Sequence, residues 1–230
     1  MKRNIIITGS TGNLGKTSIS KFLSEDYRVH AIVSPGKKIE AEIPGDLMTY
    51  EADLTNENSA HETVSGIIRK FKTIDAALLL VGGYAQGTIA NTGSELLKRM
   101  ISLNFETAYH VAQPVFQQMT TQPEGGRIIF VGSRPALVAS DGKNSLAYAL
   151  SKSLIFKLAE ILNAEGKSKN VISSVIVPST IDTPENRKAM PKANFSDWVT
   201  PEEIVESVAF ILSANGSILR DAVLKLYGKS

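Results

Sequence analysis

Apolar residues fall along the chain into short continuous runs, which alternate with longer amphipathic segments. The runs are rich in Val, Ile and Leu at successive positions, a pattern typical of strands that are covered on both faces in a parallel sheet. They predict strands near residues 4–8, 27–33, 47–51, 74–81, 126–132, 171–177 and 222–227. Helical periodicity fills the intervals, at about residues 13–24, 56–71, 94–120, 145–165 and 201–213.

This alternation of strands and helices indicates the fold class. Strands joined by right-handed helical crossovers form a doubly wound α/β sheet. We expect a single Rossmann-type domain over residues 1–230, with about seven mainly parallel strands and helices on both faces. No internal repeat or linker divides the chain, and a hydrophobic content of 43% in 230 residues is enough for a substantial core.

Composition narrows the classes of function. The formal net charge of +2 is too small to indicate nucleic acid or an acidic membrane as the main partner, and no apolar run is long enough for a membrane span. The chain has no cysteine, which excludes thiolate catalysis and disulfides and predicts a cytoplasmic protein. His30, His61 and His110 are widely scattered, so we expect no metal site.

The stretch TGSTGNLG, residues 8–15, ends the first predicted strand and opens the first predicted helix. Gly9 suits a tight turn with positive φ, Gly12 removes a Cβ next to a phosphate, and Gly15 allows close packing of the helix on the strand. The free N–H groups of the helix terminus attract phosphate. A plain glycine-rich turn is the alternative. The expected pyrophosphate-binding residues are Gly9, Ser10, Thr11, Gly12, Asn13, Leu14 and Gly15.

The end of the second predicted strand bears on the choice between NAD and NADP. An acid there usually binds the ribose hydroxyls of NAD, whereas basic groups accommodate the 2′-phosphate of NADP. The sequence is VSPGKK, with Ser34 near the position of the acid and Lys37 and Lys38 close behind. We therefore expect NADP(H) to be preferred and NAD(H) to be possible. The alternative is that both lysines are ordinary solvated loop residues.

The stretch AYALSK places Tyr148 and Lys152 four residues apart, on one face of a predicted helix. An unperturbed tyrosine has a pKa of about 10, and a nearby ammonium group favours the phenolate. Tyr148 can then protonate a reduced carbonyl or imine nitrogen, or deprotonate an alcohol in reverse, while Lys152 also holds the nicotinamide ribose. In isolation this spacing is weak, because a Tyr–Lys pair on the surface of a helix is common.

The combination of motifs resembles the short-chain dehydrogenase/reductase family over essentially the whole chain. The matching pieces follow the order of the family: TGSTGNLG, the DL of EADLT, VGG, LNF, VGS, YALSK and PSTIDT. The spacing of the glycines departs from the commoner TGxxxGxG, so that Asn13 stands where the second glycine would be. The resemblance implies an oxidoreductase with a small-molecule substrate, and a homodimer or homotetramer formed through the long helices near 94–120 and 145–165.

The resemblance also implies roles for single residues. Asp53 and Leu54 would lie beside the adenine, and Gly82 and Gly83 would line the central cleft of the cofactor site. Asn104 matches the asparagine that supports a proton relay through water and the lysine. A loop cap at Asp53 and an ordinary buried polar residue at Asn104 are the alternatives.

Ser133 matches the serine that orients the substrate, and Pro178, Ile181 and Thr183 match the segment that closes on the nicotinamide. Thr183 can equally cap a helix that begins at the following proline. Ser133 precedes Tyr148 by fifteen residues instead of the usual thirteen. Either the intervening loop carries a two-residue insertion, or the role of the serine is absent or belongs to another group.

Within the family the chain is most similar to the dihydropteridine reductase group. It shares the three-residue glycine spacing, the loop VGGYAQG and the run PSTIDTPENRKAMPKANFSDWVTPEEIVE. This likeness implies hydride transfer to a quinonoid dihydropteridine, with Tyr84 stacked on the flat ring or, alternatively, covering the cofactor as a rim aromatic. The substrate loop is expected at about 182–198, with 184–198 as a mobile lid whose apolar contacts are Phe195 and Trp198.

Two residues separate the chain from that group. Ser34 replaces the usual acid, and Ser133 stands where the group typically has no serine, because a quinonoid substrate needs no oriented carbonyl. A generic carbonyl or alcohol substrate, such as a ketone or a 3-oxoacyl group, therefore stays open. A non-catalytic dinucleotide-binding sensor is the alternative from another class, and the Tyr148–Lys152 pair argues against it.

Overall fold

The computed structural model describes residues 2–40 and 43–229. Over these residues the strands form one seven-stranded sheet in the order β3-β2-β1-β4-β5-β6-β7, and each neighbouring pair is parallel. The strands are β1 (Asn4–Thr8), β2 (Arg28–Val33), β3 (Leu47–Glu51), β4 (Ala76–Leu79), β5 (Gly126–Val131), β6 (Val171–Pro178) and β7 (Val223–Leu226). The predicted doubly wound parallel sheet is confirmed.

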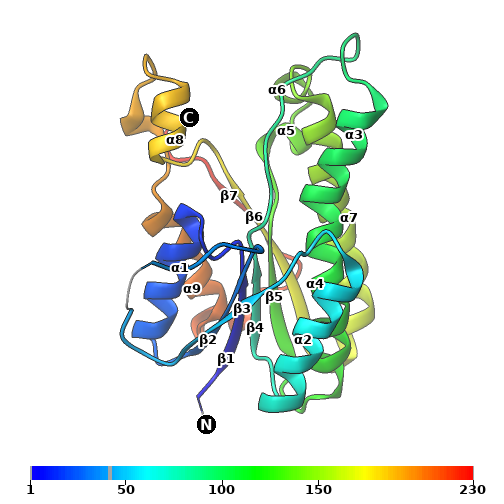
Figure 1. The fold of residues 1–230 in the computed structure, drawn as a ribbon, viewed down its shortest axis with the longest axis vertical. Coiled ribbons are helices and arrows are strands. Elements are labelled where there is room, and N and C mark those ends of the chain that lie inside the picture. Colours follow the sequence, from blue (N-terminus) through cyan, green and yellow to red (C-terminus); the bar gives the residue numbers. More distant parts are fainter. Residues whose placement is uncertain (1, 41–42, 230) are drawn as a thin grey trace.

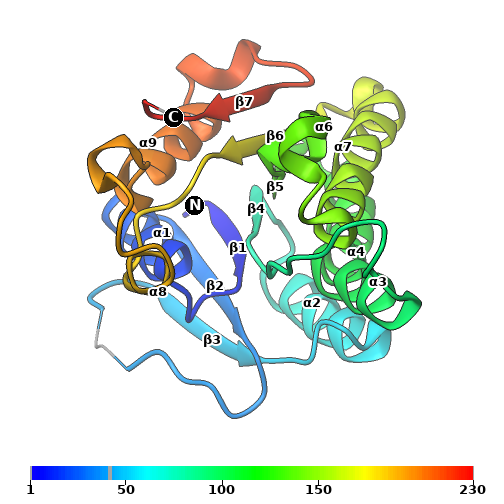
Figure 2. The same cartoon turned by 90° about the horizontal axis from the view of Figure 1, so that it is seen from above.

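Helices cover both faces of the sheet (Figures 1 and 2). One face packs against α1 (Asn13–Ser24) and α9 (Pro201–Leu212). The other face packs against α2 (Glu57–Phe71), α4 (Thr107–Thr121) and α7 (Leu146–Gly166). None of the helices in the described part of the chain has the length and apolar character needed to cross a membrane.

The two hydrophobic layers explain why the strands are apolar on successive residues. Ile6 of β1 packs into the layer beneath α2, α4 and α7, whereas Ile5 and Ile7 pack into the layer beneath α1 and α9. All three side chains are fully buried. A strand in the centre of such a sheet has no solvent face, so its alternate positions are apolar in both directions.

The long helix predicted at 94–120 is interrupted, and in this detail the prediction was wrong. The chain forms α3 (Ser94–Ile101), a π-helical turn (Ser102–Glu106) and then α4. A π-helical turn inserts an extra residue into the helical repeat, and such turns often occur at functional sites. It places Asn104 in the interior, where its side chain meets the loop that follows β4.

Several short elements fall in segments that the hydrophobic pattern leaves unassigned. They are α5 (Arg134–Leu137), α6 (Ala139–Gly142), α8 (Pro184–Ala189) and the 3₁₀ turns at Lys167–Lys169, Phe195–Asp197 and Asn215–Ile218. They are too short for a periodic pattern to predict them. Of these, α5, α6 and α8 lie at the carboxyl edge of the sheet, above the strands in Figure 1.

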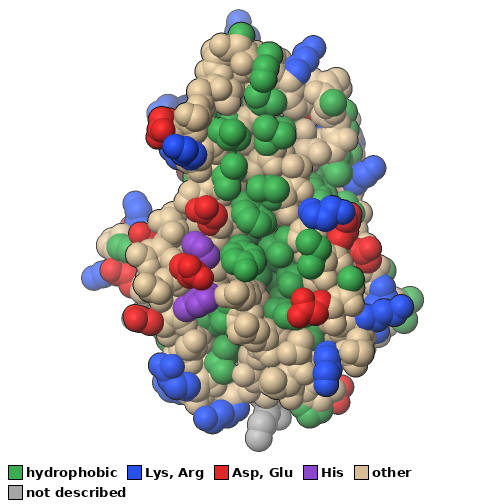
Figure 3. Space-filling view, turned by 90° about the vertical axis from the view of Figure 1, so that its right-hand side faces the viewer, with side chains coloured by type: hydrophobic (Ala, Val, Ile, Leu, Met, Phe, Trp, Pro, Cys, Tyr) green, Lys and Arg blue, Asp and Glu red, His purple; other side chains and the backbone are tan. Residues whose placement is uncertain are grey.

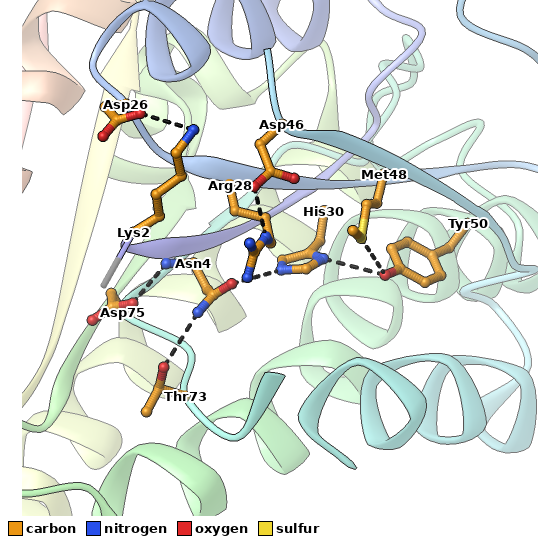
Figure 4. Close-up of polar contacts among 10 residues, drawn as sticks. All are labelled: Lys2, Asn4, Asp26, Arg28, His30, Asp46, Met48, Tyr50, Thr73 and Asp75. Atoms are coloured by element: carbon orange, nitrogen blue, oxygen red, sulfur yellow. Dashed lines mark hydrogen bonds and ion pairs between the residues drawn. The ribbon is translucent and has the colours of Figure 1, made fainter. Parts of the chain in front are cut away.

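A buried polar cluster lies near the opposite, amino ends of β1 and β2 (Figure 4). His30 is fully buried, with Nε2 at 3.1 Å from Asn4 Oδ1 and Nδ1 at 3.3 Å from the Tyr50 hydroxyl. Burial lowers the pKa of His30 to about 4, and the positive charge of Arg28 adds to the decrease. The imidazole is therefore neutral at physiological pH, held by two hydrogen bonds.

Acidification should destabilise the protein through His30. An unfolded histidine has a pKa of about 6.5, so between that pH and about 4 the unfolded chain holds a proton that the folded protein lacks. The free energy of unfolding should be unaffected by His30 above about pH 6.5 and fall by about 3 kcal/mol as the pH decreases to about 4.

Urea unfolding of the wild type and of His30→Gln at a series of pH values measures this effect. The stability advantage of the wild type over the variant should shrink by about 3 kcal/mol on acidification. A pH-independent difference between the two proteins would contradict the role of His30. His61→Gln, a substitution of the same kind on α2, is the control.

Candidate active site

The candidate site lies at the carboxyl ends of the central strands, where the order of the sheet reverses. β1 lies between β2 and β4, so the loops that follow β1 and β4 diverge to opposite sides. In an open parallel sheet this switch point is the usual place of a ligand. The Thr8 hydroxyl accepts a hydrogen bond from Leu80 N at 3.0 Å and so joins the two loops at their base.

The glycine loop has the backbone geometry that its sequence predicts. Gly9 adopts a φ of +64°, which a residue with a side chain rarely does. A Cβ on Gly15 would lie 2.3 Å from the carbonyl oxygen of Gly9, so α1 could not approach the turn as closely with any other residue there. Ser10 is buried and its hydroxyl donates to the carbonyl of Ile7 at 2.7 Å, which stabilises the turn.

A small pocket opens beside this loop at the ends of β1, β2, β3 and β4. Its lining residues are Gly9, Ile32, Val33, Ser34, Ala52, Asp53, Leu54, Thr55, Val81, Leu103 and Thr107. The fold thus brings together the predicted cofactor residues Gly9, Ser34, Asp53 and Leu54, which are far apart in the sequence. Lys37 is exposed in the turn after Ser34 and does not line the pocket.

Asp53 caps its own loop as well as lining this pocket. Its Oδ1 accepts hydrogen bonds from the backbone N–H and the hydroxyl of Thr55, at 2.9 and 2.6 Å. The Thr55 hydroxyl, followed by the Thr55 N–H, lowers the pKa of the Asp53 carboxyl. The loop cap that the sequence left as an alternative is therefore present.

Tyr148 and Lys152 lie on one face of α7, which points to the carboxyl end of β5. The Lys152 side chain is only 5% exposed, and its Nζ donates to the carbonyl of Val131 at 2.9 Å. Burial lowers the pKa of Lys152 to about 8. The Tyr148 ring meets the Tyr84 ring edge-on, with centroids 5.1 Å apart.

The pKa of Tyr148 is raised from its usual value in the protein alone. Burial raises it, the contact with Ser133 opposes the increase, and Tyr84 adds to it. The sequence predicts that the Lys152 ammonium, helped by the positive nicotinamide ring of the cofactor, lowers this pKa; among the protein's own groups, Ser133 is the one that lowers it. Both side chains are desolvated, and the ammonium is directed to the carbonyl of Val131.

Ser133 reaches the neighbourhood of Tyr148 despite the longer spacing. Its hydroxyl is buried without a hydrogen bond of good geometry to the described residues, yet it lies close enough to the phenol to favour the phenolate. The intervening chain folds into α5 and α6, which an ion pair of 2.7 Å between Arg134 and Asp141 ties together. The longer spacing therefore still brings Ser133 close to Tyr148.

Asn104 holds the loop after β4 against α7. Its Oδ1 accepts from Gly83 N at 2.8 Å, and its Nδ2 donates to Gly83 O at 3.0 Å and to the Ser151 hydroxyl at 3.1 Å. That hydroxyl in turn donates to the carbonyl of Tyr148 at 2.8 Å. Sequence analysis missed Ser151; its place directly before Lys152 on a helix is the signal that could have found it.

The predicted substrate loop, residues 182–198, contains the predicted lid segment 184–198; it leaves the sheet after β6 and returns to a narrow neck. Asp182 N donates to Val199 O at 2.8 Å, and Val199 N donates to Thr180 O at 3.1 Å. The Thr183 hydroxyl caps α8 by accepting from Asn186 N at 3.2 Å, which confirms its expected capping role.

The interior of the lid segment is held by one arginine. Arg187 binds both carboxylate oxygens of Asp182, at 2.6 and 2.7 Å, and its guanidinium lies 4.8 Å from the Phe195 ring centroid. Phe195 and Trp198, the two predicted apolar residues, pack on each other with ring centroids 4.8 Å apart. These contacts join the beginning of the segment to its end.

The known proteins that this chain resembles include dehydrogenases and reductases. A family model described as short chain dehydrogenase matches residues 3–194. Dihydropteridine reductase from Dictyostelium discoideum is 27% identical over 220 residues, which cover 90% of this chain and 87% of that protein. The 3-oxoacyl-[acyl-carrier-protein] reductase FabG of Thermotoga maritima is 24% identical, covering 97% and 95%.

Among solved structures, ElxO with NADP bound superimposes with a TM-score of 0.90 at 21% sequence identity. The match covers 99% of this chain and 98% of that one. At this level of identity the likeness concerns the fold, and the match runs through every strand and the short elements at the carboxyl edge.

The cluster around Gly82 should not tolerate a methyl group. A Cβ there would lie 2.7 Å from Asn104 Oδ1 and 3.1 Å from Lys152 Nζ, so Gly82→Ala forces both side chains to move. We expect a loss of about 1–3 kcal/mol in the free energy of unfolding.

Denaturant unfolding measures this loss, with Gly66→Ala on α2 as the control. A Cβ on Gly66 meets only Arg69 Nη2 at 3.9 Å, so that substitution should stabilise the helix by about 0.5–1 kcal/mol. Equal effects of the two substitutions would show that the cluster around Gly82 is not tightly packed.

Proposed function

The chain belongs to the short-chain dehydrogenase family of oxidoreductases, and we propose that it reduces a flat quinonoid dihydropteridine or a similar substrate with NADPH. The observation that carries this proposal is the group formed by the half-buried Tyr148 and the buried Lys152 and Ser133 beside the switch point of the sheet. The cofactor, when bound, supplies the hydride, and the protein supplies the proton and the orientation.

Several features support binding of a dinucleotide across the switch point. α1 directs its amino end toward the glycine loop, and the lack of a Cβ at Gly15 lets the helix approach the turn closely, which suits binding of a pyrophosphate by the first N–H groups. The pocket lined by Ser34, Asp53 and Leu54 suits the adenosine end. We assign five residues at the carboxyl ends of β4 and β6 to the nicotinamide end. Gly82 and Gly83 follow β4, Pro178 is the last residue of β6, and Ile181 and Thr183 follow it.

In this assignment the Tyr148 hydroxyl donates a proton to the reduced substrate. Because Lys152 has a pKa of about 8, it can release and regain a proton near neutral pH and so recharge the tyrosine. Ser133 orients the substrate and stabilises the phenolate. Asn104 keeps the helix and the loop in register, and we assign it a part in the proton relay.

The choice of substrate rests on Tyr84. Its ring is 60% exposed and stands edge-on to Tyr148, so one face is free to stack on a flat bicyclic ring. The similarity to the dihydropteridine reductase of Dictyostelium supports the same substrate class. Ser133 favours a second candidate, the reduction of an ordinary carbonyl such as a 3-oxoacyl group, which the similarity to the Thermotoga enzyme also supports.

Replacement of the proton donor separates an enzyme from a dinucleotide-binding sensor. Tyr148→Phe should lower turnover by roughly 10²–10⁴-fold, because the phenyl ring cannot donate a proton, while nucleotide binding is retained. The assay is NADPH oxidation with quinonoid dihydrobiopterin beside a panel of aldehydes, ketones and quinones. Tyr109→Phe on α4 is the control, and undiminished turnover of Tyr148→Phe would remove the assigned role.

The preference for NADPH rests on the end of β2. Ser34 lines the adenosine pocket without a charge, and Lys37 is exposed nearby and free to approach a 2′-phosphate. The carboxylate of Asp53 is already bound by Thr55. The superposition on ElxO, which was solved with NADP bound, supports the same preference.

An acid at Ser34 should reverse this preference. Ser34→Asp places a negative charge beside the 2′-phosphate and offers a carboxylate to the ribose hydroxyls, so the ratio of Kd for NADPH to Kd for NADH should rise at least about tenfold. Titration of both nucleotides by fluorescence measures the ratio, with Ser34→Ala as the uncharged control. A wild-type protein that binds NADH much more tightly than NADPH would overturn the assignment.

We also propose that two or four copies associate through α4 and α7. The face of the molecule that carries these helices shows a band of apolar side chains (Figure 3). Leu150, Leu154 and Ile161 of α7 and Tyr109 of α4 are exposed there. A continuous apolar band of this kind usually marks a surface that another protein covers.

A further inference from the structure

The amino end of α1 has no capping group of its own. The helix begins after Gly12, which has no side chain to accept from the first N–H groups, and its first turn contains no acid. By contrast, α9 begins with a complete capping box made by Thr200 and Glu203. The first N–H groups of α1 and its partial positive charge are therefore left for an anion from elsewhere.

Glu185 brings an anion to that end. Its Oε2 accepts a hydrogen bond of 2.8 Å from Nδ2 of Asn13, the first residue of α1. The N–H of Glu185 itself, then Asn13, keeps the pKa of this carboxyl below its usual value, and the charge of Lys16 contributes. The carboxylate is exposed and ionised, and it lies against the glycine loop at the end of the sequence TGSTGN.

This contact connects the lid segment to the glycine loop. Glu185 belongs to α8, which lies beyond the amino end of α1 (Figures 1 and 2). Because Arg187 ties Asp182 to Phe195 and two backbone hydrogen bonds close the neck at Thr180 and Val199, the segment is braced internally. The hydrogen bond between Asn13 and Glu185 joins this braced segment to α1.

We propose that Glu185 competes with the phosphates of the dinucleotide for the amino end of α1, so that the same carboxylate latches the lid segment and weakens cofactor binding. The inference rests on the proposed function, which places the pyrophosphate at the glycine loop. Two negative groups at one helix terminus repel each other, and entry of the pyrophosphate displaces the carboxylate and releases the latch. Because the pyrophosphate is common to both nucleotides, Glu185 acts on NADPH and NADH alike, unlike Ser34.

The test is Glu185→Gln, which keeps an oxygen acceptor for Asn13 and removes only the charge. The Kd for NADPH and the Kd for NADH should both fall about two- to fivefold, the effect of one like charge at a helix terminus. Glu185→Ala, which also removes the acceptor, should in addition speed tryptic cleavage after Arg187 and Lys188 without nucleotide. Saturating NADPH, which displaces the Glu185 carboxylate, should abolish this difference in cleavage between the wild type and the variants.

Glu202→Gln is the matched control. Its carboxylate faces the same helix one turn later, where it accepts from the Thr17 hydroxyl at 3.4 Å, and its loss should leave both Kd values unchanged. An unchanged Kd in Glu185→Gln, an effect on NADPH alone, or an equal gain in Glu202→Gln would each overturn the competition. Failure of the wild type to bind either nucleotide would overturn the proposed function as well, so the two failures are distinguishable.

Discussion

The candidate site depends on the amide of Asn104, which pairs with both backbone groups of Gly83 and with the hydroxyl of Ser151. These bonds fix the loop after β4 against α7, two elements that are distant in the sequence. The π-helical turn directs the asparagine inward, where it can make these bonds. A side chain at Gly82 would collide with Asn104 Oδ1 and Lys152 Nζ, so only glycine fits there. A buried amide with this many partners is costly to disturb, because any broken bond leaves a polar group unpaired in the interior.

The fold was predictable because its strongest signals are local. Short runs of successive apolar residues such as Ile5, Ile6 and Ile7 are typical of strands with helices on both faces, and the strands and long helices were found close to their true ends. The π-helical turn at Ser102–Glu106 could not be found in this way. The turn accompanies the contacts of Asn104 with Gly83 and Ser151, and a periodic pattern contains no information about contacts between distant segments.

The sequence predicts which residues make up the site better than it predicts the pKa values of their side chains. Tyr148, Lys152 and Ser133 were identified by resemblance, and the fold brings them together, while their roles stay predictions. The spacing of Tyr148 and Lys152 does not reveal the burial that raises the pKa of Tyr148 in the protein alone. Ser151 and Glu185 were missed for a related reason, since each matters through a contact with a distant segment.

At Gly12, the residue that precedes α1, helix stability and phosphate binding favour different side chains. A serine or aspartate at this position would cap the helix and stabilise the fold by roughly a few tenths of a kcal/mol. The same oxygen would occupy the N–H groups that a phosphate needs, and a carboxylate would repel it. A protein designed only for thermal stability would therefore be expected to carry a capping side chain here, whereas the glycine leaves the first N–H groups of α1 open to a ligand.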